Sequence, residues 1–254
     1  MQELLARLRT LDPNASLALR VVACFDELVR GRVNIHGLLG AAASLSGCVA
    51  GCFDQESARK MRVSPSGHLL GEGEMPVWAS ALETDGLTVW LEREGGAHVN
   101  DAIVLERLAL ALATRTGRRM EESLPRLGDL LDAAVDPKQR RATAATFGLA
   151  TTHRYRVATL PLFATWNQHP VLLEDVVSSS LGPLHVCVLR ADATHIGASP
   201  CGIGVAMGID NLHRSFSTAL VSLRLCQPPE VPLSWQTTTV GWSKFSPNAR
   251  SINH

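Results

Sequence analysis

Apolar residues recur with two different spacings along the first 115 residues of the chain. A spacing of three to four residues predicts helices, and short apolar runs bounded by turn residues predict strands. The predicted helices span residues 3–11, 15–29, 35–45 and 102–114. The predicted strands span residues 48–53, 60–63, 77–82 and 87–91. Along the chain, helices come first, a set of strands follows and a long helix closes the segment. This order predicts one α/β domain over residues 1–115.

The pattern changes after residue 115. Residues 116–140 are charged and carry two prolines, which predicts a linker with one short helix. Beyond it, we expect a small helix at 142–148 and strands at 155–162, 176–179, 184–189 and 203–207. Asp210 is the predicted N-cap of a closing helix whose apolar residues are Leu212, Phe216, Leu220, Leu223 and Leu225. Residues 141–232 therefore predict a second α/β domain, in a chain of the α/β (α+β) class.

The helix predicted at residues 35–45 is rich in alanine. Small side chains let neighbouring elements approach closely, so this helix lies either against a sheet or against a partner subunit. In the second case an apolar helix face is exposed on the monomer, and we therefore expect a homodimer.

Composition and charge narrow the classes of function. The chain has 254 residues, and its 24 basic and 24 acidic residues give a formal net charge of +0. Nucleic-acid-binding proteins usually carry a basic excess, so we expect no autonomous nucleic-acid binding. No apolar run reaches the length of a membrane span, and the charged first twelve residues are unlike a signal peptide. We expect a cytoplasmic protein without membrane contact.

Most of the six cysteines lie among aliphatic residues, as buried thiols do in a reducing compartment. Cys48 and Cys52 are four residues apart with His36 upstream, but no second pair of residues has the spacing of metal ligands. We interpret these cysteines as buried thiols and expect neither a metal ion nor a cofactor.

The sequence contains no pattern that is typical of an enzyme. It lacks a G-x-S-x-G elbow and an H-E-x-x-H motif, and its nine histidines are scattered without acids at fixed spacing. Glycines at 202, 204 and 208 look like a phosphate loop but match neither the dinucleotide fingerprint nor the Walker pattern. We interpret these glycines as relief of crowding along a strand, and we expect no catalytic residues.

Four segments of the second half resemble one bacterial family. They read RYRVATLPL (154–162), SLGPLHVCVLR (180–190), GIGVAMG (202–208) and LHRSFSTALVSLRL (212–225). These segments are similar to the GGDEF-like, ferredoxin-related middle domain of the PucR/CdaR-type transcriptional regulators. In that family a sensor region precedes this domain and a helix-turn-helix domain follows it. The order of elements in residues 1–115 resembles a GAF-type sensor domain, so the resemblance covers about residues 15–232.

The resemblance has consequences for both domains. A GGDEF-type cyclase needs paired glycines and carboxylates at the turn of its hairpin. The corresponding turn at residues 180–183 reads SLGP, so the second domain is expected to be a scaffold. A GAF-type domain holds its ligand beside the sheet, where Trp78 and Trp90 fall on adjacent predicted strands. They are the predicted ligand-binding residues, as walls of an apolar pocket, with core packing as the alternative.

Residues 233–254 are predicted to be an irregular tail without apolar periodicity. We hypothesise that a frameshift replaced the C-terminal part of a longer regulator, the rival being a stand-alone sensor with a disordered tail. The chain is expected to be the sensory and scaffold portion of a PucR/CdaR-like regulator that responds to a small-molecule effector. A ligand-free interaction module, or a remnant of such a regulator, is the alternative.

Overall fold

A computed structural model describes residues 13–71, 73–116, 126–166, 172–193 and 196–226. It mixes α-helices with antiparallel β-sheets, which places the chain in the α+β class. The chain divides into two compact units, the first within residues 1–124 and 174–185 and the second within 125–173 and 186–254. The predicted helix at 3–11 and the predicted tail at 233–254 lie outside the described residues.

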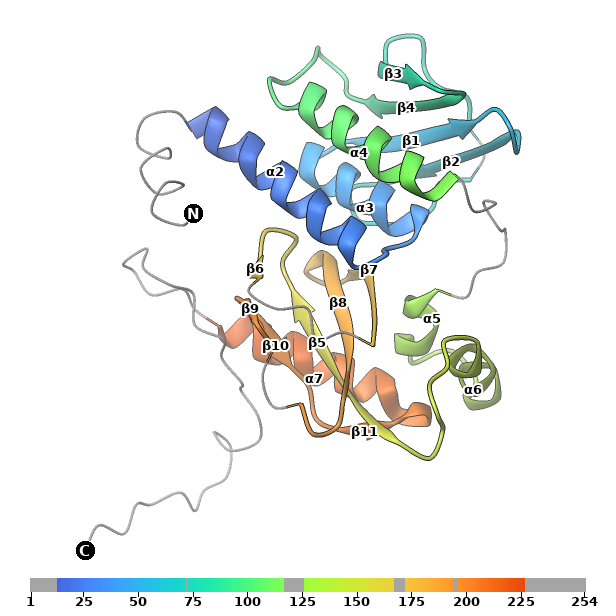
Figure 1. Cartoon of the computed structure of the whole chain (residues 1–254), viewed down its shortest axis with the longest axis vertical. Helices are drawn as coiled ribbons and strands as arrows, with labels where there is room; N and C mark the ends of the chain where they lie inside the picture. Colours follow the sequence, from blue (N-terminus) through green and yellow to red (C-terminus); the bar gives the residue numbers. More distant parts are fainter. Residues whose placement is uncertain (1–12, 72, 117–125, 167–171, 194–195, 227–254) are drawn as a thin grey trace, which may run out of the picture. The chain divides into compact units, whose positions relative to one another are not determined.

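The first unit contains a four-stranded antiparallel sheet with helices on one side (Figure 1). Its helices are α2 (Pro13–Arg30), α3 (Ile35–Ser46) and α4 (Asp101–Thr116). Its strands are β1 (Val49–Asp54), β2 (Arg59–Val63), β3 (Ser80–Thr84) and β4 (Leu87–Glu92), in the spatial order β2-β1-β4-β3. Because side chains alternate along a strand, one face carries the buried residues Ala50, Cys52, Val63, Val89 and Leu91. This face packs against α3 and α4 and forms the core of the unit.

Helix α3 is enclosed by its own unit. Asn34 caps its first turn by accepting a hydrogen bond from the Gly37 N–H at 2.8 Å, and Gly47 ends it with a φ of 72°. Residues 37–43 are all buried, and the helix contacts α2, α4, β1 and β2. Of the two predicted neighbours, the sheet is the one observed. The expectation of a homodimer therefore loses the exposed helix face from which it was derived.

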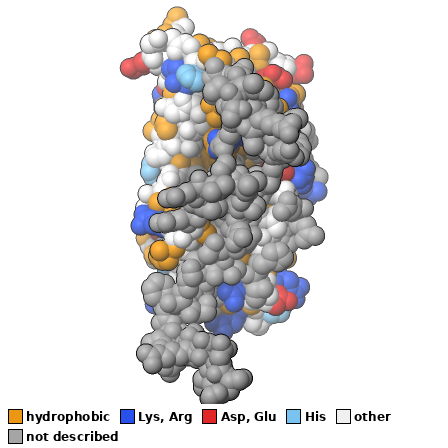
Figure 2. Space-filling view, turned by 90° about the vertical axis from the view of Figure 1, so that its left-hand side faces the viewer, with side chains coloured by type: hydrophobic (Ala, Val, Ile, Leu, Met, Phe, Trp, Pro, Cys, Tyr) orange, Lys and Arg blue, Asp and Glu red, His pale blue; other side chains and the backbone are white. Residues whose placement is uncertain are grey.

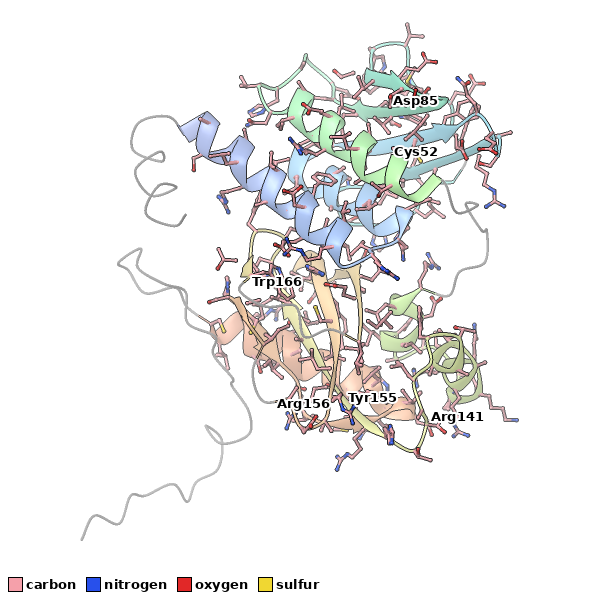
Figure 3. The ribbon with its side chains drawn as sticks, viewed as in Figure 1. Cys52, Asp85, Arg141, Tyr155, Arg156 and Trp166 are labelled. Carbon is pink, nitrogen blue, oxygen red and sulfur yellow. The ribbon has the colours of Figure 1, made fainter. Side chains whose placement is uncertain are left out.

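Strand β3 begins three residues later than predicted. Asp85 and Gly86 have positive φ angles of 44° and 78°, the pattern of a two-residue type I′ turn. Asp85 is labelled at this turn in Figure 3. The turn pairs Thr84 with Leu87 and thereby sets the register of β3 against β4. Residues 77–79 consequently precede the strand, and the prediction is wrong at this end.

A second sheet has the spatial order β10-β5-β8-β7, in which β11 also pairs with β5. Its strands are β5 (Arg154–Leu160), β7 (Leu173–Ser179), β8 (Gly182–Arg190), β10 (Gly202–Ile203) and β11 (Met207–Gly208). Strands β6 (Thr165–Trp166) and β9 (Ala198–Ser199) pair separately. The helices are α5 (Leu127–Leu131), α6 (Pro137–Thr146) and α7 (Leu212–Leu225). Residues 174–185, which hold nearly all of β7, the turn and the start of β8, group with the first unit, and the other strands of this sheet group with the second.

Helix α6 begins five residues before the predicted helix at 142–148. Asp136 caps it by accepting a hydrogen bond from the Lys138 N–H at 2.7 Å, and Pro137 occupies its first turn. Proline suits the first turn of a helix because that N–H has no partner within the helix. The prediction that Pro137 belongs to the linker at residues 116–140 is therefore wrong, because this residue lies in α6.

Two glycines let α7 cross the edge of the sheet. A Cβ atom at Gly202 or Gly204 would lie 2.2 Å or 1.9 Å from a backbone oxygen of α7, so a side chain has no room at either position. The strand predicted at 203–207 is interrupted at this crossing, where the Thr218 hydroxyl accepts a hydrogen bond from the Val205 N–H at 3.1 Å. The interpretation as relief of crowding is confirmed for Gly202 and Gly204 but not for Gly208, where a Cβ atom would have no neighbour within 4 Å.

Inside the first unit, two glycines make room for two buried acids at the end of the β7–β8 hairpin. A Cβ atom at Gly31 would lie 2.2 Å from the Glu174 carboxyl carbon, and one at Gly37 would lie 2.5 Å from Asp175 Oδ1. The Asn34 side chain donates a hydrogen bond to Asp175 Oδ2 at 2.6 Å. The residue that caps α3 therefore also binds β7.

Arg140 of α6 is a buried cation in the second unit, with 1% of its surface exposed. Its guanidinium donates to the carbonyl oxygens of Asp210 at 2.7 Å, Val135 at 2.9 Å and Asp132. Arg140 thus ties α6 to the turn before α7. Its neighbour Arg141, labelled in Figure 3, is half exposed and makes two 2.7 Å hydrogen bonds to the Asp210 carboxylate.

The predicted N-cap role of Asp210 is wrong. Its carboxylate is bound by Arg141, and the residue lies in the 3₁₀ turn Ile209–Asn211 that precedes α7. Asn211 holds the cap position, without a side-chain cap bond.

The same substitution at two positions of α3 is expected to have opposite effects. Gly37→Ala should lower the free energy of unfolding by about 1–3 kcal/mol, because its Cβ atom would overlap the Asp175 carboxylate. Gly40→Ala should raise it by up to about 1 kcal/mol, because the nearest atom lies 3.8 Å away and alanine favours a helix. Urea denaturation followed by circular dichroism measures both. Effects of the same sign would contradict the packing described for α3.

The adjacent arginines of α6 provide a second matched pair. Arg140→Met should destabilise the second unit by about 3 kcal/mol, because it leaves three carbonyl groups without their charged donor. Arg141→Met should change stability little, because exposed ion pairs contribute little. Calorimetric melting compares the two variants, and similar losses from both would contradict the role assigned to Arg140.

Candidate ligand-binding site

The face of the four-stranded sheet opposite α3 and α4 carries polar and aromatic side chains. Strand pairing places Arg62 of β2, Gly51 of β1 and Trp90 of β4 in one row across the sheet. Glu92 lies two residues beyond Trp90 and therefore on the same face. A Cβ atom at Gly51 would lie 2.2 Å from the indole of Trp90, so the ring lies directly over this glycine. Trp90 is 1% exposed.

Arg62, Glu92 and Trp90 form one hydrogen-bonded cluster. Arg62 donates from Nε to Glu92 Oε1 and from Nη2 to Glu92 Oε2, both at 2.7 Å. Trp90 Nε1 donates to Glu92 Oε1 at 3.0 Å. The Arg62 and Glu92 side chains are 22% and 7% exposed. This two-point contact fixes the plane of the guanidinium group and the direction of its remaining N–H donors.

The loop before β3 passes beside this cluster. A Cβ atom at Gly73 would lie 2.1 Å from Arg62 Nη1, so the loop backbone comes close to the donor that faces away from Glu92. A group bound to Nη1 would therefore lie next to this loop.

The electrostatics of the cluster keep it charged. Burial raises the pKa of the Glu92 carboxyl, but hydrogen bonds from Arg62 and Trp90 and the charge of Arg62 outweigh it, so its pKa is lowered overall. The hydrogen bond to Glu92 in turn raises the pKa of Arg62. Both groups are therefore ionised at neutral pH.

A second cation lies on the same face. Lys60 is paired with Phe53, and its Nζ atom lies 5.5 Å from the centre of the Phe53 ring. Two cations next to aromatic rings make a surface that suits an organic anion with a flat or apolar body.

The structure gives the two predicted ligand-binding tryptophans very different environments. Trp90 is buried on β4, and its indole N–H donates a hydrogen bond to Glu92. Trp78 lies outside the strands, in a turn closed by a 3.0 Å hydrogen bond from the Ala79 N–H to the Pro76 carbonyl, and is 54% exposed. The premise that both lie on adjacent strands fails for Trp78 because the Asp85–Gly86 turn shifts β3.

Sequence reasoning missed Arg62 and Glu92. Neither residue belongs to a pattern that singles it out as a ligand-binding candidate. The available signal was the alternation of Lys60 and Arg62 with Met61 and Val63, which separates a cationic face of β2 from an apolar one.

Among the residues that the structure describes, one group of three side chains has ligand atoms close enough for a metal ion. It consists of Glu174, His185 and Cys187, whose ligand atoms lie within 4.8 Å of one another. Cys52, by contrast, faces the helices, and burial raises the pKa of its thiol to about 12. The interpretation as a buried thiol is confirmed for Cys52, whereas Cys48 is only partly buried.

No family model, curated protein or solved structure matches the chain. Within the described part of the chain, no helix has both the length and the apolar character that crossing a bilayer would require. On the face drawn in Figure 2, described acidic and basic side chains are interspersed. Because no matching protein offers a known site for comparison, the candidate site is interpreted from the chemistry of its own residues.

Glu92→Gln is expected to flatten the acid limb of the stability profile. Folding lowers the pKa of Glu92, so the ionised carboxylate stabilises the folded protein at pH values above the unfolded pKa of about 4.3. This stabilisation is lost as the pH falls through the folded pKa. The melting temperature of the wild type should thus fall more steeply than that of Glu92→Gln between about pH 5 and about pH 3. Glu83→Gln, an exposed change on β3, is the matched control. Parallel profiles of wild type and Glu92→Gln would contradict the assignment.

Proposed function

We propose that the first unit is a GAF-type sensor domain that binds a small organic anion on the polar face of its sheet. The observation that supports this most directly is the cluster of Arg62, Glu92 and Trp90. It presents an oriented guanidinium group beside an aromatic ring, which is the chemistry that recognises a carboxylate attached to an apolar body.

The energetic cost of the cluster favours a binding role. An ion pair that is largely removed from water contributes little net stability, because desolvation offsets most of the attraction. The opposite face of the same sheet packs with uncharged residues in its buried centre, at Ala50, Cys52, Val89 and Leu91. A largely buried arginine–glutamate pair is therefore unnecessary for packing and is better explained by recognition of a charged ligand.

We further infer that the chain is the sensory and scaffold portion of a PucR/CdaR-like transcriptional regulator. The segments at 154–162, 180–190, 202–208 and 212–225 support this through their resemblance to the GGDEF-like domain of that family. The second unit would then act as a scaffold that transmits the effect of ligand binding, by shifting the population of two arrangements of the protein.

A protein-interaction module is the second candidate. Three apolar residues before β3 are exposed: Met75 at 40%, Val77 at 103% and Trp78 at 54%. Exposed apolar residues in one short segment favour contact with another protein.

A thermal-shift screen tests the sensor proposal. Carboxylates with their uncharged amides, and purines with and without an acidic group, are added to the full chain, and a ligand of the folded state must raise its melting temperature. We expect acidic compounds to give shifts that disappear in Arg62→Met/Glu92→Met, in which no buried carboxylate is left unpaired. Arg141→Met, on the second unit, is the control that should keep them.

Two results would overturn this proposal. The first is a flat response of the wild type across the panel, and the second is a shift that survives in the double variant. If the screen is flat and Trp78→Ala also abolishes self-association seen by sedimentation velocity, the interaction module is the better account.

A further inference from the structure

Three side chains of the β7–β8 hairpin converge on one point. His185 and Cys187 are two residues apart on β8 and therefore point to the same face, and Glu174 lies on the neighbouring strand β7. Their ligand atoms lie within 4.8 Å of one another. The side chains of Glu174 and His185 are 5% and 3% exposed, and Cys187 is fully buried.

We propose that Glu174, His185 and Cys187 bind a divalent transition-metal ion of the zinc class. A thiolate, an imidazole and a carboxylate are the three side-chain ligands that zinc takes in proteins. Magnesium and calcium prefer sets made of oxygen ligands alone, so the cysteine selects against them. The proposal departs from the expectation, drawn from the sequence, that the chain binds no metal.

The observed distances are within reach of a tetrahedral site. His185 Nε2 and Glu174 Oε2 lie 2.7 Å apart in a hydrogen bond. Zinc–nitrogen and zinc–oxygen bonds of about 2.0 Å would separate these atoms by roughly 3.3 Å, and a zinc–sulfur bond of about 2.3 Å would place the thiolate roughly 3.5 Å from each. The hydrogen bond must open by about half an ångström. The thiol proton must leave to solvent, and the proton of the hydrogen bond must leave Nε2, to Nδ1 if the imidazole is neutral or to solvent if it is charged.

The surrounding structure holds the carboxylate in place. Because Gly31 has no side chain, the Glu174 carboxyl group occupies the space where a Cβ atom would lie, 2.2 Å from its carboxyl carbon. At the other end of the hairpin, the Ser179 hydroxyl donates to the Gly182 carbonyl at 2.7 Å and closes the turn. Positioned ligands on paired strands lose little conformational freedom when an ion binds.

The three side chains leave one tetrahedral position for water or an added ligand. Zinc with three protein ligands and one exchangeable position differs from the closed four-ligand structural sites. Here the ion would join β7 to β8 through side chains and thereby stabilise the hairpin. The inference does not depend on the anion site of the first unit, because none of its residues is shared.

Metal titration of the full chain tests the proposal. After treatment with a chelator, the protein should bind one equivalent of Zn²⁺ in competition with a chromophoric chelator, and Zn²⁺ should raise its melting temperature. Co²⁺ in the same site should show a thiolate-to-cobalt charge-transfer band. Zinc-edge X-ray absorption of the wild type should show one sulfur ligand among nitrogen and oxygen ligands.

Cysteine variants decide which residues bind. Cys187→Ala should lose the charge-transfer band and weaken Zn²⁺ binding at least about 100-fold, the upper end of what loss of an outer-shell partner costs. Cys201→Ala, at another fully buried cysteine of the same core cluster, is the matched control and should keep both. Absence of Zn²⁺ binding, two sulfur ligands in the absorption spectrum, or a band that survives in Cys187→Ala would each overturn the proposal. The X-ray absorption measurement decides even where a variant fails to fold.

Discussion

The Asn34 side chain joins two elements that are far apart in the sequence. Its oxygen caps α3 through the Gly37 N–H, and its nitrogen donates to the buried carboxylate of Asp175 on β7. A buried carboxylate is costly without hydrogen-bond donors. Asp175 receives one from Asn34 and another from the Val176 N–H, which donates to Oδ1 at 2.8 Å. The arrangement also requires glycine at position 37, because a side chain there would occupy the space of the Asp175 carboxylate. The position of α3, and through it the packed face of the sheet, depends on this arrangement.

The sequence predicted the elements better than their ends. Periodicity placed α3, β1, β4 and α7 close to their observed ranges because each buries a face that leaves a regular pattern. The errors fall where a local interaction set the boundary. At β3 the Asp85–Gly86 turn decided the register, and before α7 the Arg141 side chain bound the acid that would otherwise cap the helix. The Asp-Gly pair is a hairpin signal that the sequence itself carries, whereas the contact of Arg141 with Asp210 is visible only once the fold brings the two residues together.

The candidate site was harder to predict than the fold. Trp90 could be named because an aromatic residue on a predicted strand is conspicuous in a sequence. Arg62 and Glu92 could not, because their contact depends on which residue of β1 pairs with each neighbouring strand, and hydrophobic patterns do not report that register. The same limit applies to Glu174 and His185, which are eleven residues apart on a hairpin.

Two of the buried or partly buried arginines, Arg140 and Arg62, show how structural and functional charge differ. Arg140 donates hydrogen bonds to three backbone carbonyl groups, and these bonds hold α6 against the turn before α7. Among the described residues, Arg62 is bound by one carboxylate through Nε and Nη2, and it remains 22% exposed. A carboxylate orients a guanidinium group on one edge and leaves the other edge for an incoming anion. Because their partners differ in this way, we assign ligand recognition to Arg62 and a structural role to Arg140. The burial of either residue is the weaker argument.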